Sequence, residues 1–512
     1  MTIDESDLTL LFSSTTLVLA GTVVGSFSKL IERVIVARWL SIEAFGEINL
    51  ALAVLHFAVT LSLVGFNQGI PRFVSRYEDD SAVRGVWLGG LGIATAVSVA
   101  IAGSLWLFDI QPVVTLFFDG GGSVQLVRLF LLALPFVVGT MVAVGTIRGL
   151  ENTRYKTLAQ DLFYPFVRIV LLVGLLSLGF GLFAAGVAYV VAAILTFVVA
   201  HLMLHRLCSL VGPVRTNVRE LVVFSAPLIV ATVLSRLLTW TDTLMLGYFR
   251  SSTEVGLYSA AYPLANSLVL LFGAFGFMYL PMISRYDAED DRDEIDRLFQ
   301  LTTKWIVVGT FPAFLALAVF PGDVLGMVFG AEYTPAALVL TILTVGFFSH
   351  AATGRNRETI SAIGFTKYVF LSNVVAFVAN VALNLLLIPR YGIAGAAVAS
   401  ASSYLFLNAF VNVVLKWRFD LSSFSGPVIR TFVGLGLFVV PPAILVSRWV
   451  SLSLYTLPVI LAISGLATVA VVGICGGLQS EDRIVVEQVE SWLGRRLPIV
   501  HRYLPKPSTV EE

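Results

Sequence analysis

The stretch that decides the fold is residues 169–200, which read IVLLVGLLSLGFGLFAAGVAYVVAAILTFVVA. It contains no charged residue, and it exceeds the length of about 20 apolar residues that one membrane span needs. The turn Gly179-Phe180-Gly181 divides it in two. Two apolar helices joined by a short turn predict an all-α polytopic membrane protein.

Composition points the same way. The chain has 512 residues, of which 57% are hydrophobic and only 13% charged, too few charges to cover a soluble surface of this size. Its net charge is zero, so no basic surface for nucleic acid is expected. Cys208 and Cys475 are the only cysteines and belong to no metal or redox motif. With no Walker loop or catalytic constellation either, we expect a transporter that has no metal, cofactor or enzymatic activity.

Hydropathy predicts about 14 transmembrane helices, and this even number allows both termini to lie on the same side. The approximate ranges are 10–36, 46–66, 84–107, 124–147, 157–178, 182–204, 221–248, 257–280, 301–321, 335–353, 367–388, 393–415, 428–447 and 455–477.

Basic residues gather in alternate loops, which predicts that both termini are cytoplasmic. The opposite loops hold only Arg38, Arg250, Arg390 and Arg448. Two inner segments resemble surface helices: the acidic stretch 286–299, whose Ile295 and Phe299 are expected to face the membrane, and the amphipathic tail 481–497.

One spacing occurs twice. Gly46 precedes Pro71 by 25 residues, and Gly256 precedes Pro281 by the same distance, 210 positions later. A shared offset of this kind predicts two copies of one unit, an arrangement by which many transporters build a binding site between their halves.

Several short segments follow one another in a family-like order. Together they resemble the polysaccharide-biosynthesis flippase branch of the MOP exporter superfamily, although Ser41 replaces the glycine usual in the first motif. The segments are Ala37-Arg38-Trp39-Leu40, Glu43-Ala44-Phe45-Gly46, Val255-Gly256-Leu257-Tyr258-Ser259-Ala260-Ala261, Gly364-Phe365-Thr366-Lys367 and Tyr391-Gly392-Ile393-Ala394-Gly395-Ala396-Ala397.

This resemblance implies two pseudo-symmetric six-helix lobes around a central cavity, plus two C-terminal helices. It also implies a flippase that moves a polyprenyl- or dolichyl-linked oligosaccharide across the cell membrane by alternating access, with the bilayer and glycosyltransferases as partners. The expected segments are an N-terminal lobe 1–206, a cytoplasmic linker 207–220, a second lobe 221–418, two extra helices 419–478 and a cytoplasmic tail 479–512.

Charges inside spans are the main candidates for a substrate site, because each costs about 2.5–3.5 kcal/mol at a helix centre. In one interpretation, basic side chains line an aqueous cavity and bind a phosphate or pyrophosphate. In the other, Glu32 pairs with Arg33 and Arg168 pairs with Asp161 to hold helices together. The candidates are Arg168, Arg236, Lys29, Arg33, Glu32, Asp161 and Asp242, which is the counterpart of Glu32 at the 210 offset.

Asparagines form two stripes, with Asn380 and Asn384 in one predicted span and Asn408 in the next. Such side chains either hydrogen-bond a sugar in the cavity or hydrogen-bond between helices. The sequence leaves both interpretations open.

Three other functions are consistent with the same sequence. They are a cation-coupled multidrug antiporter that uses Glu32 and Asp242, a peptidoglycan lipid-intermediate flippase, and a non-transport scaffold for glycosyltransferases. A coupling ion, H⁺ or Na⁺, is compatible with the first of these, but the sequence does not identify one.

Overall fold

The computed structural model is helical throughout the part of the chain that it describes, with no strand there. Contacts divide the chain into two compact units, Met1–Ser259 and Ala260–Glu512, and each is taken by itself below. The described residues are 24–107, 111, 114, 124–216, 218–478 and 482. The predicted amphipathic tail 481–497 therefore lies outside them, apart from Asp482.

Ten helices in the described ranges are long and apolar enough to cross a membrane, which confirms the all-α polytopic membrane protein. One of them, α17 (Thr366–Phe419), has a non-helical Gly392 with φ of 55°, so it holds two of the predicted spans. The first predicted span is described only from residue 24 and is helical to residue 39. The predicted spans 221–248 and 257–280 are helical but do not count among the ten.

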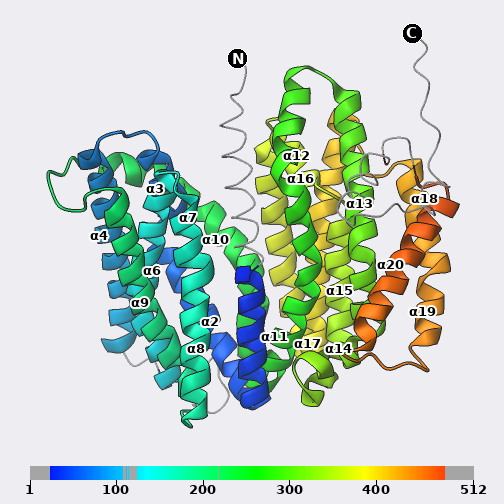
Figure 1. Ribbon diagram of the computed structural model, residues 1–512, viewed down its shortest axis with the longest axis horizontal. Helices are drawn as coiled ribbons and strands as arrows, with labels where there is room; N and C mark the ends of the chain where they lie inside the picture. The colour runs from blue at the N-terminus through cyan, green and yellow to red at the C-terminus, as the bar shows by residue number, and fades with distance from the viewer. Residues whose placement is uncertain are drawn as a thin grey trace. The chain divides into compact units, whose positions relative to one another are not determined.

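In the first unit, α6 packs against α9 and α4, and α8 packs against α9 (Figure 1). Helix α10 also belongs to this unit and packs against α2 and α3. The helices are α2 (Ile42–Ser62), α3 (Phe66–Val74), α4 (Asp80–Leu107), α6 (Val124–Gly149), α7 (Thr153–Lys156), the π-helix η1 (Thr157–Phe163), α8 (Tyr164–Ser177), α9 (Phe183–Leu207), α10 (Val218–Phe249) and the first part of α11 (Ser252–Asn266), as far as Ser259.

The two glycines of the repeated spacing pack against each other's helices. A Cβ added to Gly46 would lie 1.8 Å from the Ser252 carbonyl oxygen, and one added to Gly256 would lie 2.3 Å from the Ile42 carbonyl oxygen. Each of these carbonyls belongs to the residue four positions before the other glycine. The contact is therefore reciprocal, and only residues without a Cβ allow the backbones of α2 and α11 to come this close.

A proline explains the π-helix η1. Pro165 has no N–H to donate, and its ring crowds the carbonyl of the residue four positions earlier, Asp161. The backbone accommodates this by widening to a π-helix just before the proline. The helix of residues 24–39 passes at Gly25, whose added Cβ would lie 3.3 Å from the Asp161 carbonyl oxygen.

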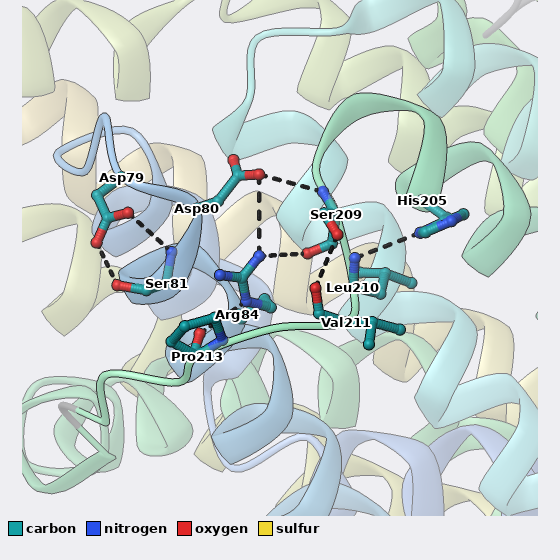
Figure 2. A network of polar contacts seen from close by, with 9 residues as sticks. All are labelled: Asp79, Asp80, Ser81, Arg84, His205, Ser209, Leu210, Val211 and Pro213. Carbon is teal, nitrogen blue, oxygen red and sulfur yellow. Dashed lines mark hydrogen bonds and ion pairs between the residues drawn. The ribbon is translucent and has the colours of Figure 1, made fainter.

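The linker from α9 to α10 is tied to the start of α4 through Arg84 (Figure 2). The buried Arg84 guanidinium donates to the carbonyls of Pro213 at 2.8 Å and Ser209 at 2.7 Å. Hydrogen bonds from Ser81 hold the pKa of the neighbouring Asp79 below its usual value. Burial at the end of α9 raises the pKa of the Cys208 thiol to about 11.

In the second unit, α13 packs against α12, α15 and α20, and α17 packs against α15 and α16. The remaining elements are η2 (Ser267–Val269), α12 (Leu270–Ala288), α13 (Arg292–Val319), α14 (Pro321–Val328), η3 (Ala331–Ala336), α15 (Ala337–Ala352), α16 (Asn356–Ala362), α18 (Gly426–Phe438), α19 (Val440–Val446) and α20 (Thr456–Ile474).

The second unit has one feature that contradicts the sequence-based expectation and one that the sequence did not predict. The stretch 286–299 is not a separate surface helix: α12 ends at Ala288, α13 starts at Arg292, and Ile295 and Phe299 are buried in the core of the unit. Lys304 on α13 forms a fully buried ion pair with Asp482, which follows α20 in the chain, at 2.5 Å between Nζ and Oδ2.

Candidate functional site

A cavity of ≈ 180 Å³ lies within the first unit. Its charged lining residues are Arg148 and Arg236, and no carboxylate appears among the described residues that line it. Helices α2, α3, α6, η1 and α10 all contribute to the wall. The other lining residues are His56, Val59, Thr60, Leu63, Asn67, Met141, Val144, Gly145 and Gln160.

Both arginines have their guanidinium groups available. Arg148 and Arg236 are exposed, and neither forms an ion pair with a carboxylate in the described part of the chain. A cavity lined by positive charge and low-dielectric walls concentrates anions. Arginine suits phosphate oxygens because its planar fork offers paired donors and remains charged at any physiological pH.

An aromatic pair forms one side of the cavity. The His56 ring stacks on Trp240 with ring centroids 4.9 Å apart and an interplanar angle of 22°. Four cationic groups act on this histidine, namely Arg236, Arg168, Lys29 and Arg33. Because Glu32 neutralises Arg168, the positive charge of the cavity comes from its own lining residues Arg148 and Arg236.

Arg168 forms an ion pair, but not with Asp161, the partner that the sequence predicts. It is buried on α8 and forms an ion pair with Glu32, which lies 136 positions earlier in the chain. Its guanidinium also lies 5.0 Å from the ring centroids of both Tyr164 and Tyr189. The predicted Arg168–Asp161 and Glu32–Arg33 pairs are wrong in their partners, because the charge nearest along the chain is not the nearest in space.

Asp161 instead pairs with Lys156, at 2.6 Å between Nζ and Oδ2. Lys29 is exposed and Arg33 is half-buried on the helix of residues 24–39. Lys29 lies within electrostatic reach of Arg168, Asp161, Arg33 and Arg236. Five charged candidates therefore lie close together in the structure, and only one of them, Arg236, lines the cavity itself.

Asp242 is buried within the first unit and does not line the cavity. It is buried on α10, 1% exposed, and its Oδ2 accepts a hydrogen bond of 2.7 Å from the Tyr258 hydroxyl. Its predicted counterpart Glu32 is held by Arg168. The two carboxylates share the repeat but have different partners.

The three asparagine candidates are buried in the second unit. The Asn384 amide donates to Asn380 Oδ1 at 3.1 Å within α17. Asn408 Oδ1 lies 3.0 Å from His350 Nδ1 on α15, and Asn356 on α16 donates to it at 3.4 Å. Asn408 therefore takes part in hydrogen bonding between helices.

Sequence patterns missed five polar residues of the cavity: His56, Thr60, Asn67, Arg148 and Gln160. Arg148 lies one residue past the predicted span 124–147, which gave no reason to place it in a cavity, and His56 belongs to no motif. For one of them, Gln160, the sequence does offer a signal. It lies five positions before Pro165 inside a predicted span, and a π-helix forms just before that proline. No group of three or more metal-ligating side chains occurs in the ranges that the structure describes.

The long apolar helices define a multi-pass membrane protein. A family model described as "Polysaccharide biosynthesis protein" matches residues 11–287, and a MatE model matches residues 227–386. The first match covers more than half of the chain, which therefore belongs to the polysaccharide biosynthesis protein family.

Two relatives come from Haloferax volcanii. The "Probable low-salt glycan biosynthesis flippase Agl15" is 30% identical over 219 residues, which are 42% of this chain and 44% of the relative. The "Probable flippase AglR" is 23% identical over 387 residues, 74% of this chain and 78% of the relative. The first alignment thus spans less than half of the relative's own length.

Solved structures share the fold. A structure titled "Lipid II flippase MurJ, inward closed conformation" has a TM-score of 0.68 at 15% identity and covers 90% of this chain and 98% of its own. An inward-facing multidrug resistance MATE family transporter of the MOP superfamily has a TM-score of 0.67 at 14% identity, over 79% of this chain and 98% of its own. At these identities the likeness concerns the fold alone.

Proposed function

We propose that this protein is a flippase that moves a polyprenyl- or dolichyl-linked oligosaccharide from the inner to the outer leaflet by alternating access. The observation that carries the proposal is the cavity of the first unit, which offers Arg148 and Arg236 and, among the described residues that line it, no carboxylate. Family membership and the relatives named as glycan flippases support a lipid-linked glycan as the cargo.

The chemistry of the cavity suits the phosphate of such a lipid. A phosphate or diphosphate in the apolar core of a membrane needs charged donors, since it leaves its hydration shell behind. Arg148 and Arg236 supply forked donors from two different helices, α6 and α10. The lipid tail stays in the bilayer, where its apolar surface costs nothing to expose.

The same proposal includes a topology of fourteen spans with both termini in the cytoplasm, arranged as lobes 1–206 and 221–418 with two added helices. The division of α17 at Gly392 and the unequal distribution of basic loop residues support it. On this topology Arg148 lies at the cytoplasmic end of its span, where the cargo enters.

Multidrug antiport is the second candidate, favoured by the MatE match over residues 227–386. A cationic drug needs carboxylates in its cavity. In the first unit Glu32 is paired with Arg168 and Asp242 with Tyr258, and neither lines the cavity. We therefore rank this function below glycan export.

Flipping assays in proteoliposomes separate these functions. Purified protein is reconstituted with a fluorescent polyprenyl diphosphate-linked oligosaccharide, and transfer between leaflets is followed by quenching from outside. Arg236→Met and Arg148→Met are expected to slow flipping at least tenfold, whereas the exposed Arg154→Met, on the short helix α7 outside the cavity, serves as the matched control. Unchanged flipping in both cavity variants would refute the anion site; efflux of a cationic dye without lipid flipping would favour antiport, and neither activity would indicate a scaffold.

A further inference from the structure

The two ends of α17 meet at one edge of the second unit. Gly392 divides the helix into two halves, and contacts between its ends show that these halves form a hairpin. The rings of Phe365, just before α17, and Phe419 have centroids 4.6 Å apart. Across 50 positions of the chain, Arg418 donates to the Tyr368 hydroxyl at 3.1 Å. On the proposed topology this edge faces the cytoplasm.

Two cations at this edge rest on aromatic rings. The Lys367 Nζ atom lies 5.2 Å from the centroid of the Tyr368 ring, and the Arg418 Cζ atom lies 5.6 Å from that of Phe365. Both rings pack against the buried core cluster of the unit that includes Leu415. Because a ring face attracts a cation, this aromatic platform of Phe365 and Tyr368 orients both charged groups.

The same two cations have no acidic partner in the ranges that the structure describes. Both side chains are exposed, and neither forms an ion pair with a carboxylate there. The carboxylate closest to Arg418 along the chain, Asp420, pairs with Lys416 at 2.5 Å instead. Like charges that converge on one tyrosine repel each other, and a bound anion removes this repulsion. The arrangement therefore indicates an anionic ligand.

Apolar surface adjoins the two cations. Phe370 and Leu371 lie one helical turn further into the span than Lys367 and are 46% and 45% exposed. Exposed apolar side chains of a membrane-spanning helix face lipid tails. Trp417, beside Arg418, is 89% exposed, and tryptophan is enriched at the level of the lipid headgroups. The cations therefore lie at the border between lipid tails and water.

We propose that the ends of α17 bind the headgroup of an anionic phospholipid. Arg418 offers forked donors to the phosphate, Lys367 adds a second positive charge, and the acyl chains lie along the exposed apolar face of α17. A soluble anion would use the charges alone, whereas a lipid also covers the adjoining apolar surface. The site belongs to the second unit and does not depend on the cavity of the first unit as the substrate site.

Photo-cross-linking in nanodiscs tests this site directly. The full-length protein is placed in phosphatidylcholine nanodiscs with increasing amounts of a phosphatidylglycerol that carries a diazirine near its headgroup, and the labelled peptides are quantified by mass spectrometry. We expect labelling of the peptides at both ends of α17. A phosphatidylcholine with the same diazirine is expected to need at least fivefold more probe for half-maximal labelling there.

Two substitutions each remove one charge from the site. Arg418→Met and Lys367→Met are each expected to raise the amount of phosphatidylglycerol probe needed for half-maximal labelling about fivefold, the effect of one basic residue near an anionic membrane surface. Arg430→Met is the matched control, because it removes an exposed arginine of α18 from the same unit, and it is expected to change nothing.

A third variant tests the platform without changing any charge. Tyr368→Phe keeps the ring and removes the hydroxyl that accepts the hydrogen bond from Arg418. We expect it to raise the amount of probe for half-maximal labelling about threefold, the effect of one hydrogen bond to a charged group at an exposed position. General attraction between the protein and anionic lipid would not produce this loss.

Three results would overturn the site. They are equal labelling by the two lipid probes, a loss in Arg430→Met as large as in Arg418→Met, and displacement of the probe by soluble glycerol 3-phosphate as effectively as by unlabelled phosphatidylglycerol. The cavity variants Arg148→Met and Arg236→Met are expected to leave the labelling at α17 unchanged. Failure of the proposed substrate cavity and failure of this lipid site are therefore separate results.

Discussion

Replacement of Gly46 by alanine tests the reciprocal contact between the repeated units. The new Cβ would lie 1.8 Å from the Ser252 carbonyl oxygen and 2.9 Å from the Gly256 backbone nitrogen. Side-chain Cβ atoms in proteins essentially never approach other atoms within 3.0 Å, so α2 and α11 must separate by at least ~1.2 Å. Both obstructing atoms are backbone, and no rotamer change relieves them.

We expect Gly46→Ala to destabilise the protein by about 2–3 kcal/mol, the upper part of the range for overpacked cores. The separated helices cannot recover this loss from the hydrophobic effect, because lipid offers the same apolar surroundings as another helix. Gly256→Ala, whose Cβ would meet the Ile42 carbonyl oxygen at 2.3 Å, is expected to behave alike. The double variant should lose less than the sum, since both changes open one contact.

The assay is thermal unfolding of purified protein in detergent, followed by size-exclusion chromatography after heating. Gly103→Ala in α4 is the matched control: no atom lies within 4 Å of its added Cβ, and alanine favours a helix by about 0.5–1 kcal/mol over glycine. If Gly46→Ala unfolds at the same temperature as this control, the close contact between α2 and α11 does not exist as described.

Three further changes follow from the charged and buried groups. Lys304→Met leaves Asp482 buried without its charge partner and is expected to cost about 3–5 kcal/mol in thermal unfolding, whereas adding Asp482→Leu should restore most of it; equal losses in both would contradict the pairing. Cys208, with a pKa of about 11, should react with a maleimide at pH 8 about 100-fold more slowly than free cysteine, and its rate should still rise between pH 9 and pH 11; mass spectrometry of the labelled peptide measures the rate. Arg84→Met removes two hydrogen bonds to the α9–α10 linker and should speed cleavage there in limited proteolysis, while no change would show that the linker is held by other contacts.

Sequence periodicity and composition were sufficient for the class of fold, because the apolar stretches are long and the glycine turns between them are short. The turn at Gly179 and Gly181 has positive φ at both glycines, as a tight turn requires. The division at Gly392 within α17 also falls where hydropathy separates two spans. These are local properties that a chain carries in its own residue order.

Long-range partners were not predictable in the same way. Arg168 has a carboxylate seven positions earlier, and helical spacing makes that Asp161 the obvious partner. In the structure Arg168 pairs instead with Glu32, which lies on the helix of residues 24–39. That helix lies close because it packs at Gly25 against the widened turn before Pro165. The cavity depends on the same tertiary packing, which is why Asn67 and Gln160 could not be selected from the sequence.

The most direct test of the central claim is substrate protection of the cavity in the first unit. Met141, which lines it, is replaced by cysteine in a chain whose two native cysteines are serine, and labelling by a maleimide is timed with and without a short-chain polyprenyl diphosphate-linked disaccharide. We predict that the lipid slows labelling at least fivefold, and that Arg236→Met abolishes this protection. Labelling at the same rate with and without a lipid that the protein demonstrably flips would contradict the assignment of this cavity as the substrate site.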